Sequence, residues 1–326
     1  MRDPGRLVNN ALLRALVARL GFRVARALVG HALVPLVVGP ARRRHLRHRV
    51  HGYLGSYFPA LGARAQDERA REFLRHYRAK LAEDCIALNI AGLDRFLDVV
   101  LDRVRYEGAE HFVRALYAPA GILAVGAHVG SPTLGTAALL PLFLRVPPER
   151  YRPVRLCIEP EAERYPELTR NLEGVLREYG GDLGFVPSGT DTRRVAGEMG
   201  RCLAQGGLVT TNLDVLAGGA SERTFLLFGR ARVRLPALVG AAKLALRSGA
   251  LVLPWVNLRT PEGFRLVLEP PIGPVPQLGE AVSEEHPETV ALCEKLRSVL
   301  EGWIAAQPEQ WFYWDRFHQR LVRDSP

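Results

Sequence analysis

Cysteine and lysine are scarce in this chain. The four cysteines lie far apart, form no Cys-x-x-Cys pair and have no histidine nearby at the spacing of metal ligands. These absences argue against a disulfide framework and against structural zinc, so we expect no bound metal and buried free thiols in a reducing cytoplasm. Only three of the 44 basic residues are lysines. Because an arginine excess can follow genome composition, we attach no function to it.

A long apolar run is also missing near the N-terminus. The uncharged stretch Ala27–Ala41 has 15 residues and includes His31 and Pro35, whereas a membrane-spanning helix needs about 20 apolar residues. The arginines that follow at 42–44, and the lack of a small-x-small cleavage site, argue against a signal peptide. The stretch is therefore short for a membrane crossing.

The net positive charge of the chain is confined to the first fifty residues. Residues 1–50 contain eleven arginines and a single acidic residue, Asp3, for a net charge of +10, whereas residues 51–326 contain 33 basic and 33 acidic groups. Because basic charge does not extend over the fold, we expect no nucleic-acid partner. We divide the chain into a basic, amphipathic, helical segment, residues 1–50, and a single domain, residues 51–326.

The basic segment has the pattern of a helix that lies on a membrane surface. Residues 6–29 show helical spacing, with apolar residues on one side and an arginine stripe beside them, and five more arginines follow between 42 and 49. This arrangement suits an interface rich in anionic lipid. One expectation is a cytoplasmic protein that touches the inner face of the membrane through residues 6–49. The alternatives are a helix packed on its own domain with a solvated basic face, and a docking site for an acidic carrier protein.

From residue 121 onward, short apolar runs alternate with helical stretches, whereas residues 60–120 are predicted to be helical. The runs have the form of buried strands and lie at Gly121–Gly126, Val154–Ile158, Leu208–Asn212, Ala250–Asn257 and Phe264–Leu268. The helical stretches lie at Thr133–Leu144, Pro166–Tyr179, Thr192–Gln205 and Leu235–Arg247. This alternation predicts an α/β fold with a largely parallel central sheet flanked by helices, preceded by a helical N-terminal segment.

His128 comes just after the first predicted strand, within the string Ala-Val-Gly-Ala-His-Val-Gly-Ser-Pro-Thr-Leu-Gly that covers residues 124–135. Gly130 and Ser131 follow it, and Pro132 suits the first position of a helix. Ligands bind at the carboxyl ends of strands in such sheets, and a histidine there can remove a proton from a hydroxyl or an amine. A purely structural histidine is the alternative.

Four stretches, in order along the chain, match the motifs of one enzyme family. The arginines of residues 42–49 lead to Tyr57-Phe58-Pro59, and His128-x-Gly130 follows the first strand. The third stretch comprises Leu213-Asp214, Phe228-Gly229, the helix of residues 235–247 and residues 250–254. The closing block, Pro-Glu-Gln-Trp-Phe-Tyr-Trp-Asp-Arg-Phe at residues 308–317, is the most specific.

Together these stretches resemble the lipid A late acyltransferase family (lauroyl and myristoyl transferases), within the wider lysophospholipid and glycerolipid acyltransferase superfamily. The resemblance implies transfer of an acyl group from an acyl-carrier-protein or coenzyme A thioester to a hydroxyl. It implies His128 as the base, with no metal, no covalent acyl-enzyme and no bound cofactor. An oxyanion needs donors aimed at it, and the backbone N–H groups of Gly130 and Ser131 are the expected ones.

The chain departs from the family where the family's motif places an acid. Thr133 stands five residues after His128, at the position that carries Asp or Glu in the His-x4-acid motif. A threonine supplies no charge to orient and stabilise an imidazolium. Another acid can serve instead, and Asp214, just past the Leu208–Asn212 strand, is the first candidate. The other two interpretations are chemistry that needs a weaker base, as with an amine acceptor, and a loss of catalysis.

Other residues are weaker candidates. Arg177, Arg193 and Arg194 flank residues 183–187 and are candidates for binding a phosphate or the phosphopantetheine of a donor, although solvated helix charges explain each of them as well. Ser131 beside His128 allows a hydrolase interpretation, but the chain has no Gly-x-Ser-x-Gly elbow. The aromatic residues of the closing block are expected to be packing.

We therefore expect an acyltransferase that moves an acyl group from a carrier-protein or coenzyme A thioester to a hydroxyl or an amine. One alternative is a catalytically silent relative that binds a lipid or a carrier protein. The other is a thioester or ester hydrolase that uses Ser131 and His128.

Overall fold

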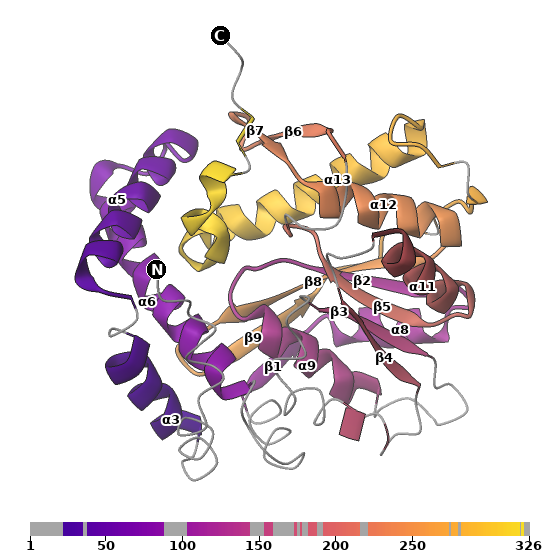
Figure 1. Ribbon diagram of the computed structural model, residues 1–326, viewed down its shortest axis with the longest axis horizontal. Coiled ribbons are helices and arrows are strands. Elements are labelled where there is room, and N and C mark those ends of the chain that lie inside the picture. The colour runs from indigo at the N-terminus through magenta and orange to yellow at the C-terminus, as the bar shows by residue number, and fades with distance from the viewer. Residues whose placement is uncertain are drawn as a thin grey trace.

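A seven-stranded sheet in the order β1-β9-β8-β2-β5-β3-β4 forms the centre of the computed structural model (Figure 1). Neighbouring strands run parallel except for the β8–β9 pair, which is antiparallel. This arrangement confirms the predicted α/β class with a largely parallel sheet. The structure describes residues 22–34, 38–87, 103–143, 153–158, 173–174, 177, 182–187, 192–215, 221–273, 275–279, 282–319 and 321–322.

The strands follow the apolar runs of the sequence. Their bounds are β1 (Val104–Glu107), β2 (Ile122–Gly126), β3 (Val154–Ile158), β4 (Leu183–Pro187), β5 (Leu208–Asn212), β8 (Leu251–Arg259) and β9 (Phe264–Leu268). All five residues of β2 are buried, as expected for a parallel strand covered on both faces. A separate hairpin of β6 (Thr224–Leu227) and β7 (Ala231–Arg234) was not predicted.

Strand β1 corrects the prediction that residues 60–120 are helical throughout. Only four residues long, β1 extends the sheet beside β9. Its burial alternates, with Val104 buried and Arg105 exposed. Two periods of alternation are too short to stand out from helical spacing in a sequence. The predicted helix at Pro166–Tyr179 lies largely outside the described residues.

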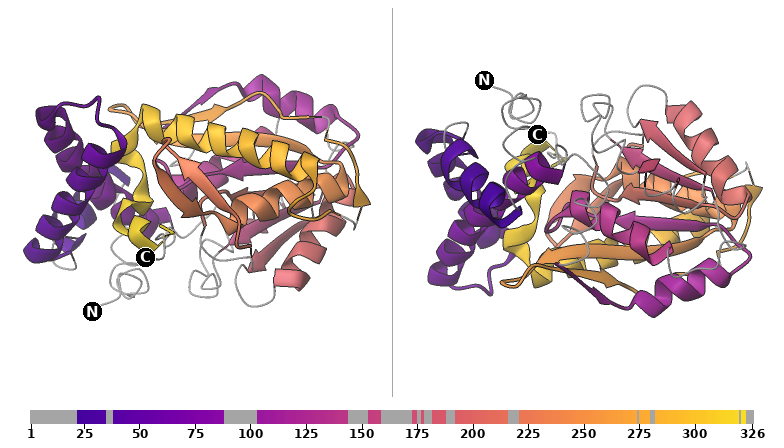
Figure 2. Two further views of the ribbon diagram at one scale, coloured as in Figure 1. Left: turned by 90° about the horizontal axis from the view of Figure 1, so that it is seen from above. Right: turned by 90° about the horizontal axis from the view of Figure 1, so that it is seen from below.

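Helices cover both faces of the sheet (Figures 1 and 2). Helix α12 packs against β2 and β5 and also contacts α11 and α13, while α8 and α9 pack against β8 on the other face. The bounds are α8 (Ala109–Tyr117), α9 (Pro132–Phe143), α11 (Thr192–Ala204), α12 (Pro236–Ser248) and α13 (Pro287–Ala306). Helix α12 begins with Pro236 and is capped after Ser248 by Gly249, whose left-handed φ of 66° favours glycine.

The N-terminal helices form a layer at one end of the sheet (Figure 2). They are α3 (Phe22–Leu28), the π-helical turn Val29–Leu33, α5 (Pro40–Tyr57) and α6 (Ala63–Ala87). Helix α5 packs on α6 and runs without a break across the expected boundary at residue 50. Of the predicted amphipathic helix at residues 6–29, the part before residue 22 lies outside the described residues. Within the described ranges, no helix is long and apolar enough to cross a bilayer.

The closing segment, residues 308–319, lies between the N-terminal helices and the sheet (Figure 1). It consists of three short 3-10 turns, at Pro308–Gln310, Phe312–Asp315 and Phe317–Gln319. Its aromatic rings are in mutual contact; for example, the ring centroids of Trp311 and Trp314 are 4.7 Å apart. The segment therefore joins the helical layer to the edge of the sheet at which β2 and β5 end.

Candidate active site

Strands β2 and β5 bring His128 and Asp214 together. The two strands pair in parallel with Gly126 opposite Asn212, and the N–H of Leu213 donates to the carbonyl of Gly126 at 2.8 Å. His128 and Asp214 each lie two residues beyond these paired positions. Because parallel strands end at the same edge of a sheet, both side chains emerge side by side there. The predicted proximity of Asp214 to His128 is therefore observed.

His128 and Asp214 form a hydrogen-bonded pair. The Nδ1 atom of His128 lies 2.8 Å from Oδ1 of Asp214. An ionised carboxylate has only acceptor atoms, so Nδ1 is the N–H nitrogen in this contact, and in the neutral imidazole the lone pair is then on Nε2. The side chain of Asp214 is fully buried, whereas that of His128 is 13% exposed. The geometry thus fixes one nitrogen of the ring and leaves the other for chemistry.

Oδ2 of Asp214 is held by two further donors. The backbone N–H of His128 and the indole N–H of Trp311 both donate to it, each at 2.9 Å. A buried carboxylate is costly unless it is hydrogen-bonded, and donors to the charged form favour ionisation. These contacts therefore stabilise Asp214 as a carboxylate.

The closing segment packs directly against the His128 loop. The N–H of Phe312 donates to the carbonyl of His128 at 2.9 Å, and Val129 forms an antiparallel bridge with Trp311. The ring of Tyr313 meets the imidazole edge-on, with the centroids 4.6 Å apart. Sequence reasoning treated these aromatic residues as packing. The signal that could have revealed a further role is that a buried indole N–H usually has a hydrogen-bond partner.

The predicted oxyanion donors are already in use. The N–H of Gly130 donates to the carbonyl of Gln310 at 3.0 Å, and the N–H of Ser131 donates to the carbonyl of Asn257 at 2.8 Å. Gly130 has a φ of 72°, and a Cβ there would lie 2.0 Å from the Asn257 oxygen. Both amides that the sequence suggested as oxyanion donors are therefore bonded to backbone carbonyls in this structure.

Ser131 does not contribute its hydroxyl to the pair, and Thr133 supplies no carboxylate. The Ser131 side chain is fully buried, and its Oγ has no hydrogen-bond partner among the described residues, so it does not bond to His128. Thr133 is half-buried in the first turn of α9. The carboxylate beside the imidazole is that of Asp214, whereas the sequence motif places its acid at residue 133.

The candidate phosphate-binding arginines lie beside a different strand. Arg193 and Arg194 are exposed in the first turn of α11, which begins after the carboxyl end of β4. Three strand positions separate β4 from β2, about 14 Å at ~4.8 Å per strand. Arg177 is exposed and pairs with Glu173 on its own helical turn, with an Nη2–Oε2 distance of 3.7 Å. Arg193 and Arg194 therefore lie at the same edge of the sheet as His128, but beside the strand three positions away.

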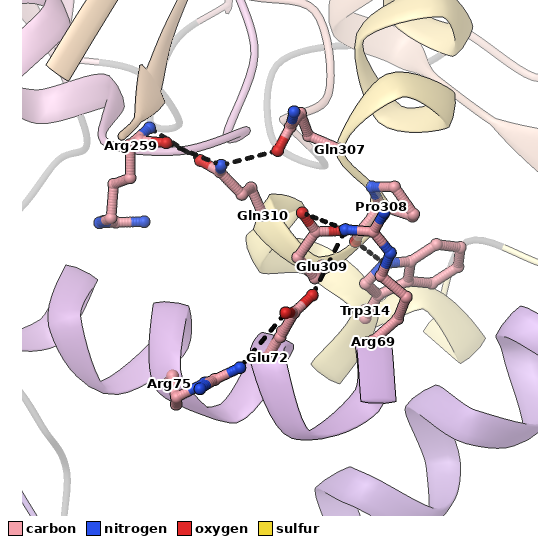
Figure 3. Close-up of polar contacts among 9 residues, drawn as sticks. All are labelled: Arg69, Glu72, Arg75, Arg259, Gln307, Pro308, Glu309, Gln310 and Trp314. Carbon is pink, nitrogen blue, oxygen red and sulfur yellow. Dashed lines mark hydrogen bonds and ion pairs between the residues drawn. The ribbon is translucent and has the colours of Figure 1, made fainter. Parts of the chain in front are cut away.

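Gln310 anchors the closing segment to β8 (Figure 3). Its Oε1 accepts from the N–H of Arg259 at 2.8 Å, and its Nε2 donates to the Arg259 carbonyl at 3.1 Å. One residue earlier, Glu309 pairs with Arg69 of α6 at 3.0 Å, and burial raises the pKa of Glu309. These contacts hold in place the Gln310 carbonyl that accepts from the N–H of Gly130.

The described residues contain two buried thiols and no cluster of metal-ligating side chains. Within those ranges, no three His, Cys, Asp or Glu side chains gather as metal ligands. Cys202 and Cys293 are buried and free, and burial raises their pKa to about 11 and about 12. Such thiols are unreactive at neutral pH because the thiolate is the nucleophile. The other two cysteines lie where the structure gives no side-chain description.

The comparison with protein families agrees with the resemblance drawn from the motifs. Residues 200–323 match the model of a family described as bacterial lipid A biosynthesis acyltransferase. The matched part contains Asp214 and residues 308–319, whereas His128 lies before it. No curated protein matches the chain.

Proposed function

Membership in the bacterial lipid A biosynthesis acyltransferase family, which the match over residues 200–323 supports, is the premise from which we propose that this protein is an acyltransferase with His128 as its general base. The donor is an acyl thioester, carried by an acyl carrier protein or by coenzyme A. The acceptor is a hydroxyl or an amine. In this proposal the donor is a substrate and no further cofactor takes part.

The observation that carries the proposal is the 2.8 Å contact between Nδ1 of His128 and Oδ1 of Asp214. It leaves Nε2 as the ring nitrogen that does not face the carboxylate, on a side chain that is 13% exposed. An imidazole paired in this way can accept a proton near neutral pH, because the carboxylate stabilises the imidazolium that forms. A structural histidine that is completely enclosed by packed side chains would have no such accessible nitrogen.

The proposed reaction has two proton transfers. First, Nε2 removes the proton from the acceptor hydroxyl or amine as the acceptor oxygen or nitrogen attacks the thioester carbonyl carbon. The tetrahedral intermediate then collapses, the carbon–sulfur bond breaks, and the imidazolium returns the proton to the departing thiolate. The products are the acylated acceptor and a free thiol, and the enzyme is regenerated without a covalent acyl-enzyme.

Asp214 takes over the role of the acid that is missing at Thr133. Removing the carboxylate from a catalytic triad lowers the rate by ~10⁴, so a chain with threonine at 133 and no substitute would be severely impaired. The buried carboxylate of Asp214, with donors on both oxygens, supplies that charge. This arrangement supports activity over a silent relative.

The position of Arg193 and Arg194 supports a donor with a phosphate. Both lie on the sheet edge that carries His128, and arginine suits bidentate phosphate contacts. A phosphodiester in the arm of a carrier protein, or the phosphates of coenzyme A, would offer the shared chemistry. We place the acyl chain and its thioester nearer His128 and the phosphate nearer α11.

The N-terminal helices support a peripheral position on the inner face of an anionic membrane. On α3, Val24 and Leu28 are 57% and 40% exposed and lie one helical turn apart. Between them Arg26 contacts Glu83 of α6 at 3.5 Å, so α3 stays packed on its own domain while its apolar side faces outward. Binding to vesicles with anionic lipid, lost when Val24 and Leu28 are changed to serine, would support this part of the proposal. Equal binding by the native protein and by this variant would contradict it.

An assay of thiol release tests the proposed function. The full chain is incubated with acyl-coenzyme A and acyl-carrier-protein thioesters of several chain lengths, each with and without a hydroxyl or amine acceptor. We expect thiol release only when an acceptor is present, together with the acylated acceptor in equal amount. His128→Asn is the control for adventitious hydrolysis.

The other outcomes of this assay contradict acyl transfer in different ways. Release without an acceptor, at the same rate, would indicate a hydrolase. No release with any donor, while the chain still binds the thioester, would indicate a silent relative. Ser131 offers the hydrolase no support, because its buried Oγ does not bond to His128.

A further inference from the structure

Trp311 is the residue through which the C-terminal end of the chain reaches the His128–Asp214 pair. It lies 97 positions after Asp214, is fully buried, and donates its indole N–H to Oδ2 of that carboxylate at 2.9 Å. The other oxygen, Oδ1, faces Nδ1 of His128. The indole, together with the backbone N–H of His128, therefore holds one oxygen of the carboxylate, while the imidazole uses the other.

We propose that Trp311 is a positioning residue for general-base catalysis: its indole N–H fixes the rotation of the Asp214 carboxylate so that Oδ1 stays aligned with Nδ1 of His128. The proposal rests on the function proposed above, in which His128 is the base. Trp311 touches neither the acceptor nor the thioester in this account and acts only through Asp214.

The chemistry of the indole suits this task. An indole N–H donates a hydrogen bond but neither accepts one nor takes up a proton near neutral pH. It therefore stabilises Asp214 as a carboxylate without competing for the proton on Nδ1. A hydroxyl or a carboxylic acid at the same place would bring an acceptor atom, and with it an alternative direction for the hydrogen bond.

Trp311 is itself held by contacts to the loop that carries His128. The backbone of Trp311 bridges Val129, and the next N–H, that of Phe312, donates to the carbonyl of His128 at 2.9 Å. The same short stretch thus touches the base through its backbone and the acid through its side chain. Any movement of Trp311 relative to His128 would alter both contacts together.

Trp314 provides a matched control within the same segment. It is also fully buried, and it also donates its indole N–H, in this case to the carbonyl of Pro308 at 2.6 Å. It packs edge-on against Trp311 but donates no hydrogen bond to Asp214. Trp311→Phe and Trp314→Phe therefore remove the same atoms from the same aromatic cluster, and only the first removes a donor from the carboxylate.

The experiment compares the two variants in the full chain. We expect Trp311→Phe to lower kcat by ~10- to 100-fold with KM within ~3-fold of the native value, as expected for loss of one hydrogen bond to a charged group. The pH at which turnover falls to half on the acid side is expected to move as well. Trp314→Phe is expected to keep kcat within ~3-fold and to leave the pH profile in place.

A proton NMR signal provides a readout that does not depend on activity. The Nδ1–H proton shared with Asp214 is expected far downfield and is identified by its loss in His128→Asn. It is expected to shift or broaden in Trp311→Phe and to stay in place in Trp314→Phe. If the native chain transferred no acyl group at all, this signal would still test the role of Trp311, so failure of the proposed function and failure of this inference are distinguishable.

Equal losses of kcat in the two variants, or an unmoved Nδ1–H signal in Trp311→Phe, would reduce Trp311 to packing and overturn the proposal. If Trp311→Phe does not fold, a second measurement follows the indole N–H signals of Trp311 and Trp314, both of which are then present. In Asp214→Asn, the Trp311 indole proton is then expected to move upfield while that of Trp314 stays. Movement of neither signal, or of both equally, would overturn the proposal.

Discussion

Two contacts, each between a buried carboxylate and a basic side chain, are tied to the closing segment, and they differ in the chemistry of the basic partner. The Arg259 guanidinium meets the Glu83 carboxylate through three N–O contacts of 2.6 to 3.1 Å, with Glu83 fully buried and Arg259 7% exposed. Asp214 is equally buried, but its partner His128 uses only one ring nitrogen.

This difference separates a structural contact from the one that we propose to be reactive. A guanidinium cannot give up a proton in a protein, and its planar fork matches a carboxylate on two atoms. An imidazole has a second nitrogen and changes its charge near neutral pH. Both contacts are also tied to the closing segment, Arg259 through Gln310 and Asp214 through Trp311. The same segment therefore supports the fold on one side and the proposed chemistry on the other.

The largest expected effect concerns the reactive contact. His128→Asn removes the base while keeping a side chain of similar size and a polar atom near Asp214. Loss of a positioned general base costs ~10² to 10⁴ in rate, so we expect thiol release in the presence of an acceptor to fall by a factor in that range. Thermal unfolding of the variant checks that the fold is retained. Turnover within a few-fold of the native rate would show that His128 is structural.

Breaking the Glu83–Arg259 contact should affect stability instead. Glu83→Gln leaves the Arg259 charge buried without its counterion, and breaking a buried pair in this way costs about 3–5 kcal/mol. We expect denaturant unfolding to show a loss of that order, with kcat per folded molecule unchanged. Glu68→Gln, which breaks an exposed pair with Arg64 on the same helix, is the control and is expected to cost less than about 1 kcal/mol. Similar losses in both variants would contradict the buried role of Glu83.

The neighbourhood of Arg259 also predicts a pH dependence. Burial, and then the charges of Arg259, Arg75 and Arg69, lower the pKa of His76 from 6.5 to about 4. The unfolded chain therefore binds a proton that the folded chain does not between pH 6.5 and 4, and His76 makes the free energy of unfolding fall as the pH is lowered through this window. At ~1.4 kcal/mol per pKa unit, the upper limit of this contribution is about 3 kcal/mol.

His76→Gln tests that contribution. Unfolding by urea at several pH values between 4 and 7 is expected to give a flatter curve for this variant than for the native chain. His48→Gln, at an exposed position of α5, serves as the control and is expected to follow the native curve. A native slope retained in His76→Gln would assign the acid sensitivity to other groups.

The smallest effect is expected at Thr133. If Asp214 supplies the carboxylate, Thr133→Val is expected to change kcat by less than ~3-fold, within the range of an ordinary substitution of about 0.5 kcal/mol. Steady-state kinetics on the purified variant measures this. A loss of ~30-fold or more would return a catalytic role to position 133.

Much of the sheet was predictable because its strands are continuous apolar runs bounded by glycine or polar residues. His128 and Asp214 were found for the same reason, since each follows such a run and parallel strands end at one edge. Strand β1 was missed because four residues are too few to show a period. The prediction of the strands and that of the His128–Asp214 pair needed no knowledge of side-chain contacts between distant segments.

What could not be predicted depends on partners far away in the sequence. The amides of Gly130 and Ser131 looked free at the start of a helix, but the carbonyls of Gln310 and Asn257 occupy them. Glu83 lies on a helix rich in exposed charges, and nothing local marks it as buried. Trp311 was expected to pack, and only the fold shows that its N–H meets Asp214.

The most direct test of the account is the turnover of Asp214→Asn, measured by thiol release with saturating donor and acceptor. The amide keeps the size of the side chain and removes its charge, so the imidazolium loses its stabilising partner. By analogy with catalytic triads, the account predicts a fall in kcat of ~10² to 10⁴ with the fold retained. A variant that turns over at close to the native rate would contradict the assignment of Asp214 as the carboxylate that serves His128.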